Sequence, residues 1–223
     1  MPIEAIVFDM DGVLVDSEVY WDKSRVDFAR DRGKVWTDEF QRLAMGRSTV
    51  GWAGVMQEKL ALDESIDDII AEMKARVIAH YEERLPARPG ALESVSHMQQ
   101  HFRVGLASGS PTEIIKAVLS ITGLDQIFEV MIYGDEVKRG KPAPDIYLKA
   151  LEQLGVAPAV SLGIEDSANG LRSLKAAGML AVAAPSPDYP LPDDILAQAD
   201  AHISTLEDFT VDLVRGIAGG GRL

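Results

Sequence analysis

The stretch Ala5-Ile6-Val7-Phe8-Asp9-Met10-Asp11-Gly12 places two acidic residues directly after a short apolar run. Consecutive apolar residues of this kind are typical of a strand buried on both faces of a parallel sheet. Two carboxylates at the end of such a strand lose hydration and repel each other, so they require a cation or another partner. Because open α/β sheets bind ligands at the carboxyl ends of their strands, the stretch predicts a chemical site beside a central strand.

Further apolar runs of strand length alternate with helical patterns along the rest of the chain. The runs are Val104–Ala107, Val130–Ile132, Val160–Ile164 and Leu180–Ala183, and the helical patterns are Thr112–Ile121, Ile146–Leu154 and Ala168–Ala177. Gly123, Gly155 and Gly178 stand where these helices would end. This order predicts an α/β fold, a Rossmann-like parallel sheet with helices on both faces.

The segment from residue 16 to residue 85 breaks the alternation. It contains no convincing strand, and its apolar residues have the spacing of amphipathic helices. The sequence therefore predicts an α-helical cap domain, residues 16–85, inserted into a catalytic core formed by residues 1–15 and 86–223. An insert that begins beside the acidic pair is expected to act as a lid, and a purely structural insert is the alternative.

Composition narrows the class of protein. The 223 residues include no cysteine, which excludes thiol catalysis and cysteine-ligated metals. No apolar run is long enough for a signal peptide or a membrane span, so we expect a cytoplasmic protein without a membrane partner. The net charge of −13 argues against a nucleic-acid partner, although a few cations in one pocket can still hold a small phosphorylated molecule.

Three more polar groups follow the later strands. Ser108-Gly109-Ser110 comes after the second strand, where a hydroxyl and free N–H groups can bind an anion. Lys141, in a turn fixed by Pro142, comes after the third, and taken alone it would be a surface lysine. Alone, Ser108 or Ser110 would be assigned as a helix cap.

Glu165 and Asp166 follow the fourth strand. Two consecutive acids at a strand end can complete a metal site with the first acidic pair. Taken alone, Asp166 or Ser167 would instead be assigned as a helix cap.

Together these four segments resemble the haloacid dehalogenase superfamily, in particular its phosphatase branch with a helical cap. Asp9-Met10-Asp11-Gly12-Val13-Leu14 combined with Gly140-Lys141-Pro142-Ala143-Pro144-Asp145 is a specific combination, and the resemblance extends to about Phe209. The subgroup is similar to sugar-phosphate phosphatases, phosphoglycolate phosphatases and β-phosphoglucomutases.

The resemblance assigns roles that suit the chemistry of these side chains. Asp9 is expected to attack phosphorus as a nucleophile, and Asp11 to act as general acid and then general base. Mg²⁺ is expected to bind Asp9, Asp166 and the main-chain carbonyl of Asp11, with Glu165 either a ligand through water or a neighbouring acid. Ser108 and the N–H groups near Gly109 would hold a phosphoryl oxygen. Lys141 would neutralise the nucleophile and the transferring group.

Substrate choice is expected to lie in the cap, with Glu18, Trp21, Arg47 and Ser48 as candidates. Arg47 lies in a loop, Met45-Gly46-Arg47-Ser48, that resembles the substrate-facing cap loop of the subgroup, and the alternative is a solvated arginine. Trp21 can stack on a sugar ring, but an aromatic at helical spacing also suits a cap core. By resemblance a histidine occupies this position in β-phosphoglucomutase, so Trp21 favours a phosphatase.

The sequence thus predicts a magnesium-dependent phosphatase that acts on a small phosphorylated metabolite, a sugar or polyol phosphate, through an aspartyl-phosphate. A β-phosphoglucomutase-like mutase and a phosphoglycolate phosphatase are the first alternatives. A non-catalytic protein that binds a phosphorylated metabolite is another. A monomer or a weak homo-oligomer is expected.

Overall fold

The computed structural model describes residues 2–44, 47, 49–187 and 189–219. The chain forms two compact units, one made of Met1–Asp16 with Pro86–Leu223 and the other of Ser17–Leu85. The cap was predicted to begin at Asp16, whereas the second unit begins at Ser17.

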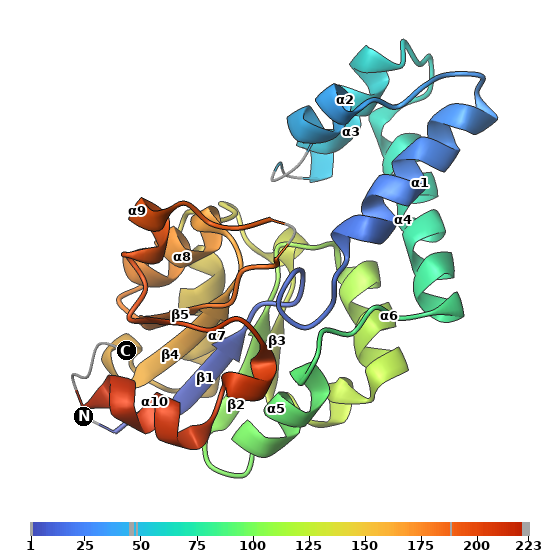
Figure 1. Cartoon of the computed structure of the whole chain (residues 1–223). Helices are drawn as coiled ribbons and strands as arrows, with labels where there is room; N and C mark the ends of the chain where they lie inside the picture. The colour runs from blue at the N-terminus through green and yellow to red at the C-terminus, as the bar shows by residue number, and fades with distance from the viewer. Residues whose placement is uncertain (1, 45–46, 48, 188, 220–223) are drawn as a thin grey trace. The chain divides into compact units, whose positions relative to one another are not determined.

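The larger unit is built on a parallel sheet of six strands in the order β3-β2-β1-β4-β5-β6 (Figure 1). The strands are β1 (Ala5–Phe8), β2 (Arg103–Ala107), β3 (Val130–Ile132), β4 (Ser161–Glu165), β5 (Leu180–Ala183) and β6 (Ala201–His202). The predicted α/β fold is therefore confirmed. The short β6 was not predicted, since its two residues carry no apolar run.

The helices of this unit lie between the strands in the chain, except that η4 and α10 follow the last strand. They are α5 (Ala91–Met98), α6 (Thr112–Thr122), α7 (Asp145–Leu154), α8 (Ala168–Ala176), α9 (Asp193–Leu196) and α10 (Val211–Ala218), with short 3₁₀ turns η1 (Leu124–Gln126), η2 (Gly134–Glu136), η3 (Pro158–Val160) and η4 (Leu206–Asp208). The three predicted helices correspond to α6, α7 and α8, with each end within one residue. Gly123 and Gly155 cap α6 and α7 in the left-handed conformation, as their positions predicted.

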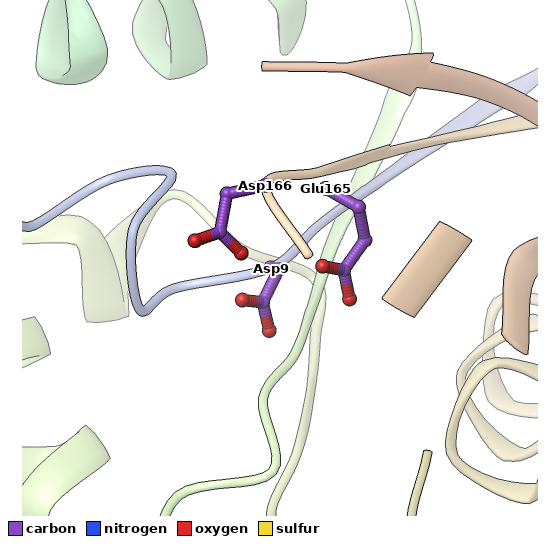
Figure 2. Close-up of side chains that lie close together, drawn as sticks. All are labelled: Asp9, Glu165 and Asp166. Atoms are coloured by element: carbon purple, nitrogen blue, oxygen red, sulfur yellow. The ribbon is translucent and has the colours of Figure 1, made fainter. Parts of the chain in front are cut away.

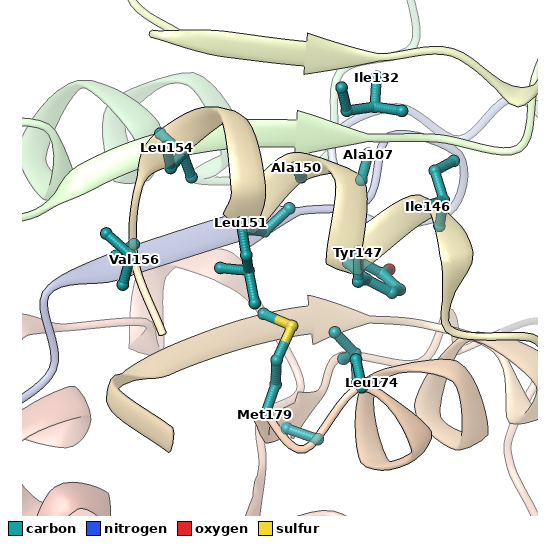
Figure 3. Close-up of a cluster of buried hydrophobic side chains, with 14 of the residues drawn as sticks. Ala107, Ile132, Ile146, Tyr147, Ala150, Leu151, Leu154, Val156, Leu174 and Met179 are labelled. Carbon is teal, nitrogen blue, oxygen red and sulfur yellow. The ribbon is translucent and has the colours of Figure 1, made fainter. Parts of the chain in front are cut away.

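The hydrophobic core beside α7 holds the strand ends in place. Figure 3 shows Ile146 of α7 near Ala107 and Ile132 of neighbouring strands, and Leu151 and Leu154 farther along the helix. Leu154 is fully buried. Burying a leucine of this kind contributes about 1.5–3 kcal/mol relative to leaving it exposed. The core thus fixes the sheet edge from which the polar loops emerge.

The strand order reverses direction at β1. The chain runs from β1 to β2 and β3 on one side, and then crosses to β4, β5 and β6 on the other. Phe8, at the end of β1, lies opposite Leu106 of β2 and Ile164 of β4. Ligands of such sheets bind where the order reverses, at the carboxyl ends of the strands. Asp9 is the first residue beyond that point.

The second unit consists of helices, and its described residues contain no strand. The helices are α1 (Glu18–Asp31), α2 (Asp38–Ala44), α3 (Thr49–Lys59) and α4 (Ile66–Glu83). Arg32 joins α1 to α4 through ion pairs of 2.7 Å to Glu64 and 2.6 Å to Glu72, and its guanidinium lies over the Phe28 ring. Among the described residues of the whole chain, no helix is long and apolar enough to span a membrane.

Candidate active site

The predicted acidic residues lie at the ends of adjacent strands. Asp9 follows β1, Ser108 follows β2, Glu165 ends β4, and Asp166 follows it. One carboxylate oxygen from each of Asp9, Glu165 and Asp166 lies within 4.8 Å of the other two. Figure 2 shows these three side chains close together. Residues far apart in the sequence therefore meet at the edge of the sheet beside β1.

Lys141 supplies a cation to this cluster. It lies in the loop between η2 and α7, and its peptide bond to Pro142 is cis. Its Nζ donates to Oδ1 of Asp9 at 2.6 Å, to Oε1 of Glu165 at 2.5 Å and to the main-chain carbonyl of Ala107 at 3.2 Å. An ammonium group has three donors, and all three have acceptors here. With its side chain 13% exposed, Lys141 is not a surface lysine.

Glu165 is anchored by more than this lysine. It is fully buried, and its Oε1 also accepts a hydrogen bond of 2.6 Å from the Tyr147 hydroxyl of α7. Its Oε2 accepts one of 3.1 Å from Ser167 Oγ. Ser167 in turn accepts from the N–H of Gly170 and caps α8, so the helix-cap alternative applies to Ser167. Both oxygens of Glu165 thus have protein donors, which fix the carboxylate that holds Lys141.

The described side chains of this cluster carry more carboxylates than ammonium groups. Burial raises the pKa of Asp9 well above its usual value, and the carboxylate of Glu165 adds to the rise while Lys141 opposes it. Burial, with Glu165 nearby, also raises the pKa of Asp166 to about 8. Burial lowers the pKa of Lys141, but Asp9 and Glu165 outweigh it and raise that pKa well above its usual value. A further cation would therefore favour the ionised carboxylates.

Asp11 is held by hydroxyl groups of the loop after β2. Its Oδ2 accepts hydrogen bonds of 3.0 Å from Ser108 Oγ and 2.7 Å from Ser110 Oγ. Its Oδ1 is buried and has no hydrogen-bond partner among the residues that the structure describes. The N-cap of α6 is Pro111, which makes no side-chain cap bond. The alternative in which Ser108 or Ser110 caps this helix is therefore wrong.

Gly12 allows the loop after β1 to pass Asp166. Its φ is 73°, a left-handed conformation that favours glycine, and a Cβ atom at this position would overlap the Asp166 carboxylate. The buried Arg88 side chain donates to the main-chain carbonyl of Gly12 and, at 3.0 Å, to that of Ala184. The turn that carries both acids is thus fixed by close packing and by a buried arginine that sequence reasoning did not single out.

The cap candidates lie in the second unit. Trp21 is 6% exposed and packs against Trp52, with ring centroids 5.3 Å apart, so most of its surface lies in the cap interior. Arg47 is exposed and lies between α2 and α3. Ser48, with Met45 and Gly46, lies outside the described residues. The roles of Trp21 and Arg47 in substrate contact stay predictions.

Glu18 belongs to a polar network in the cap that the sequence did not indicate. Its Oε1 accepts from Arg25 at 3.0 Å and from Gln41 at 2.6 Å. Oε1 of Gln41 accepts from Arg25 and from the indole N–H of Trp36. Arg25 is 3% exposed, so it is part of the cap interior. The Glu18 carboxylate is thus held in one orientation, and its contact with substrate stays a prediction.

The donor set of the acidic cluster fits a hard divalent cation. Asp9, Glu165 and Asp166 offer carboxylate oxygens only, which are the ligands that Mg²⁺ and Ca²⁺ prefer. Burial first, and neighbouring carboxylates second, raise the pKa values of Asp9 and Asp166, so a further cation would favour their ionised forms. Both observations agree with the predicted metal-binding group of carboxylates.

Comparison with known proteins agrees with this geometry. The family model for haloacid dehalogenase-like hydrolases matches residues 3–178. The chain is 34% identical to a phosphorylated carbohydrates phosphatase of Thermotoga maritima over 79% of this chain and 82% of that protein. It is 31% identical to hexitol phosphatase B of Escherichia coli K12, over 93% and 95% of the two chains. The crystal structure of CbbY from Rhodobacter sphaeroides in complex with phosphate superposes with a TM-score of 0.81 at 27% identity, covering 93% of this chain and 96% of that one.

Proposed function

The chain belongs to the haloacid dehalogenase-like hydrolase family, and we propose that it is a magnesium-dependent phosphatase that hydrolyses a sugar or polyol phosphate. One observation carries the proposal. Lys141 holds Asp9 at 2.6 Å within a group of carboxylates that also includes Asp166. A buried carboxylate kept beside an ammonium group suits a nucleophile that must approach a dianion.

In the first step an Asp9 carboxylate oxygen forms a bond to phosphorus, and the bond from phosphorus to the substrate oxygen breaks. The electron pair of the broken bond goes to that oxygen, which takes a proton from Asp11. The products are an aspartyl-phosphate and a free alcohol. In the second step water attacks phosphorus, Asp11 takes a proton from it, and Asp9 leaves as a carboxylate. Two easier steps thus replace one very slow step.

The contacts of Asp11 support its assignment as general acid. Oδ2 already accepts two hydroxyl donors, whereas Oδ1 has no partner among the described residues. The two hydroxyl donors hold the carboxyl group in one orientation, which suits a general acid. A positioned acid of this kind typically contributes about a hundred- to ten-thousand-fold in rate.

The remaining groups bind the phosphoryl group and compensate its charge. Ser108 Oγ and the N–H groups near Gly109 donate to phosphoryl oxygens, and Lys141 neutralises charge on Asp9 and on the transferring group. Asp9, Asp166 and the main-chain carbonyl of Asp11 would hold Mg²⁺, which supplies positive charge to the phosphate when bound. Glu165 orients Lys141 because both of its oxygens already have protein donors.

The substrate class rests on the relatives and on the cap. Two similar proteins are named for phosphorylated carbohydrates and for hexitol phosphates. A cap that offers an oriented carboxylate, Glu18, and an exposed guanidinium, Arg47, suits a polyhydroxy substrate, because both groups hydrogen-bond to hydroxyls. Trp21 is buried against Trp52, so we assign it a structural role in the cap that carries Glu18 and Arg47.

Phosphate release from a panel of hexose, hexitol, pentose and two-carbon acid phosphates tests the function. We expect turnover with Mg²⁺, loss of turnover in EDTA, and no turnover by Asp9→Asn although its circular dichroism is unchanged. The control is Asp208→Asn, which alters an exposed acid of the same unit and should retain full activity. Near-normal activity of Asp9→Asn would exclude the nucleophile assignment.

The same panel distinguishes a mutase. A mutase would interconvert isomers of a sugar monophosphate when primed with a sugar bisphosphate, and it would release little phosphate. Failure to transform any phosphate ester would favour a binding protein instead.

A further inference from the structure

Ser110 lies in the loop between β2 and α6, and the proposed reaction does not yet use its side chain. Its hydroxyl donates to Oδ2 of Asp11 at 2.7 Å, the shorter of the two hydrogen bonds to that oxygen. We propose that Ser110 is the positioning residue for the general acid, fixing the rotation of the Asp11 carboxyl group for proton transfer to the leaving oxygen. This inference rests on the proposed phosphatase function.

The number of hydrogen bonds that each hydroxyl can donate distinguishes the role of Ser110 from that of Ser108. A serine hydroxyl has one proton and so donates one hydrogen bond at a time. Ser108 Oγ donates to Asp11 and accepts from the N–H of Ser110 at 3.1 Å. When Ser108 turns its proton to a phosphoryl oxygen, it no longer donates to Asp11. Among the described residues, the Ser110 hydroxyl is then the donor that remains on Oδ2. This is the stage at which Asp11 must deliver its proton.

The main chain of Ser110 is held firmly enough for this role. Its carbonyl accepts a hydrogen bond of 3.1 Å from the N–H of Gly134, and the N–H of Ser108 donates to the carbonyl of Ile132 at 3.2 Å. A Cβ atom on Gly134 would overlap the carbonyl of Gly109, so the two loops are in close contact. The hydroxyl is therefore carried by backbone that is tied to the end of β3.

The two oxygens of Asp11 differ in a way that a fixed rotation explains. Two hydroxyl donors on Oδ2 hold the carboxyl group in one rotation, while Oδ1 is buried and has no partner in the described part of the chain. In the proposed step the proton of Asp11 moves to the leaving oxygen as the phosphorus–oxygen bond breaks and the Asp9–phosphorus bond forms. Without the Ser110 hydroxyl the carboxyl group can rotate, and fewer complexes have the proton in position.

Leaving-group dependence tests this role. Phenyl phosphate releases a phenol of pKa about 10, which needs a proton, whereas p-nitrophenyl phosphate releases an anion that is stable near neutral pH. For Ser110→Ala we expect kcat/KM to fall about 10- to 100-fold for phenyl phosphate and less than about 3-fold for p-nitrophenyl phosphate. The ratio kcat/KM is the informative quantity because it reports the first chemical step and excludes hydrolysis of the intermediate.

Three further variants make the test specific. Ser110→Thr keeps the hydroxyl and should recover most of the activity toward phenyl phosphate. In Asp11→Asn the general acid is absent, so adding Ser110→Ala should cause little further loss. Ser161→Ala removes another serine hydroxyl, fully buried at the opposite end of β4 and bonded to the carbonyl of Pro158, and should leave both rates unchanged.

The outcomes separate this inference from the proposed function. Equal losses on both aryl phosphates, or a full additional loss in the Asp11→Asn background, would show that Ser110 binds phosphate or supports the loop, and would overturn its role toward Asp11. A wild-type protein that hydrolyses neither aryl phosphate nor any sugar phosphate would overturn the proposed function itself, and this inference with it.

Discussion

Replacing Asp166 by asparagine is expected to stabilise the metal-free protein while removing activity. Burial, with the carboxylate of Glu165 nearby, raises the pKa of Asp166 to about 8, from an ordinary value of 3.8 that the unfolded chain retains. The folded state therefore binds the proton of this carboxyl group more tightly than the unfolded state does. Keeping the group ionised at neutral pH opposes folding.

The sign and the size follow from this difference in pKa. Below about pH 4 the carboxyl group is protonated in both states and does not oppose folding. As the pH rises, the group ionises first in the unfolded chain, and the free energy of unfolding falls. The fall stops near pH 8, the pKa of the folded state. Each tenfold change in proton affinity corresponds to about 1.4 kcal/mol, so the ionised group opposes folding by at most about 4 kcal/mol at pH 7. Because Asp166 is only half-buried, solvent screening lowers the expected gain for Asp166→Asn to about 1–3 kcal/mol.

Urea unfolding in EDTA at pH 5 and pH 8 measures this gain. Far-UV circular dichroism is the appropriate signal, because Trp21, Trp36 and Trp52 are the three tryptophans of the chain and all lie in the cap unit. Their fluorescence follows the cap and serves as an internal reference. Asp208→Asn is the matched control, since its exposed carboxylate lies in the same unit as Asp166.

Mg²⁺ should reverse the order of stability. An ion that binds the folded state alone stabilises it by about 2.7 kcal/mol at one hundred times its dissociation constant. The wild-type protein should gain this stabilisation, whereas Asp166→Asn lacks a charged ligand and should gain much less. A variant that is less stable than the wild type at pH 8 in EDTA, or a difference equal at pH 5 and pH 8, would refute the electrostatic reasoning.

Two further predictions concern recognition and packing. Arg47→Ala should change the preference among sugar and polyol phosphates more than it slows p-nitrophenyl phosphate hydrolysis, because the exposed cap guanidinium is expected to contact the part of the substrate that varies. Comparison of kcat/KM over the substrate panel checks this, and uniform losses would contradict it. Leu154→Ala should lower the free energy of unfolding by about 2–5 kcal/mol, because the side chain is fully buried in the core beside α7. Urea unfolding measures that loss, and a change below about 1 kcal/mol would show that the core adjusts around the cavity.

The strands and helices of the central sheet could be predicted because burial on both faces leaves a continuous apolar signal. The runs at Val130–Ile132 and Leu180–Ala183 coincide with β3 and β5. The two-residue β6 carries no such signal and was missed. Helix α5 was also missed, although Ala91, Val95 and Met98 have helical spacing and are buried. The pattern is only eight residues long and directly follows the proline-containing stretch Pro86–Gly90, so its helical signal is weak.

The clustering of the candidate site was predictable from the positions of its residues along the chain. Asp9, Lys141 and Asp166 each follow a strand, and parallel strands bring such positions to one edge. The hydrogen bonds that orient these side chains were not predictable. Tyr147 lies on the apolar face of a helix and looks like a core residue, and only its hydroxyl contact with Glu165 reveals a second role.

The charges of the site link its stability to its selectivity. Asp9, Glu165 and Asp166 surround one ammonium group, that of Lys141, so the cluster attracts a divalent cation and repels a phosphate dianion until such a cation is bound. A chain of net charge −13 has no general attraction for a dianion. Affinity for the phosphate of the proposed substrate must therefore come from groups within the site. These are the ammonium of Lys141, the hydroxyl of Ser108, main-chain N–H groups near Gly109 and a bound cation. Under the proposed function, the excess of carboxylates that opposes folding without metal is thus the feature that would make phosphate binding depend on a metal ion.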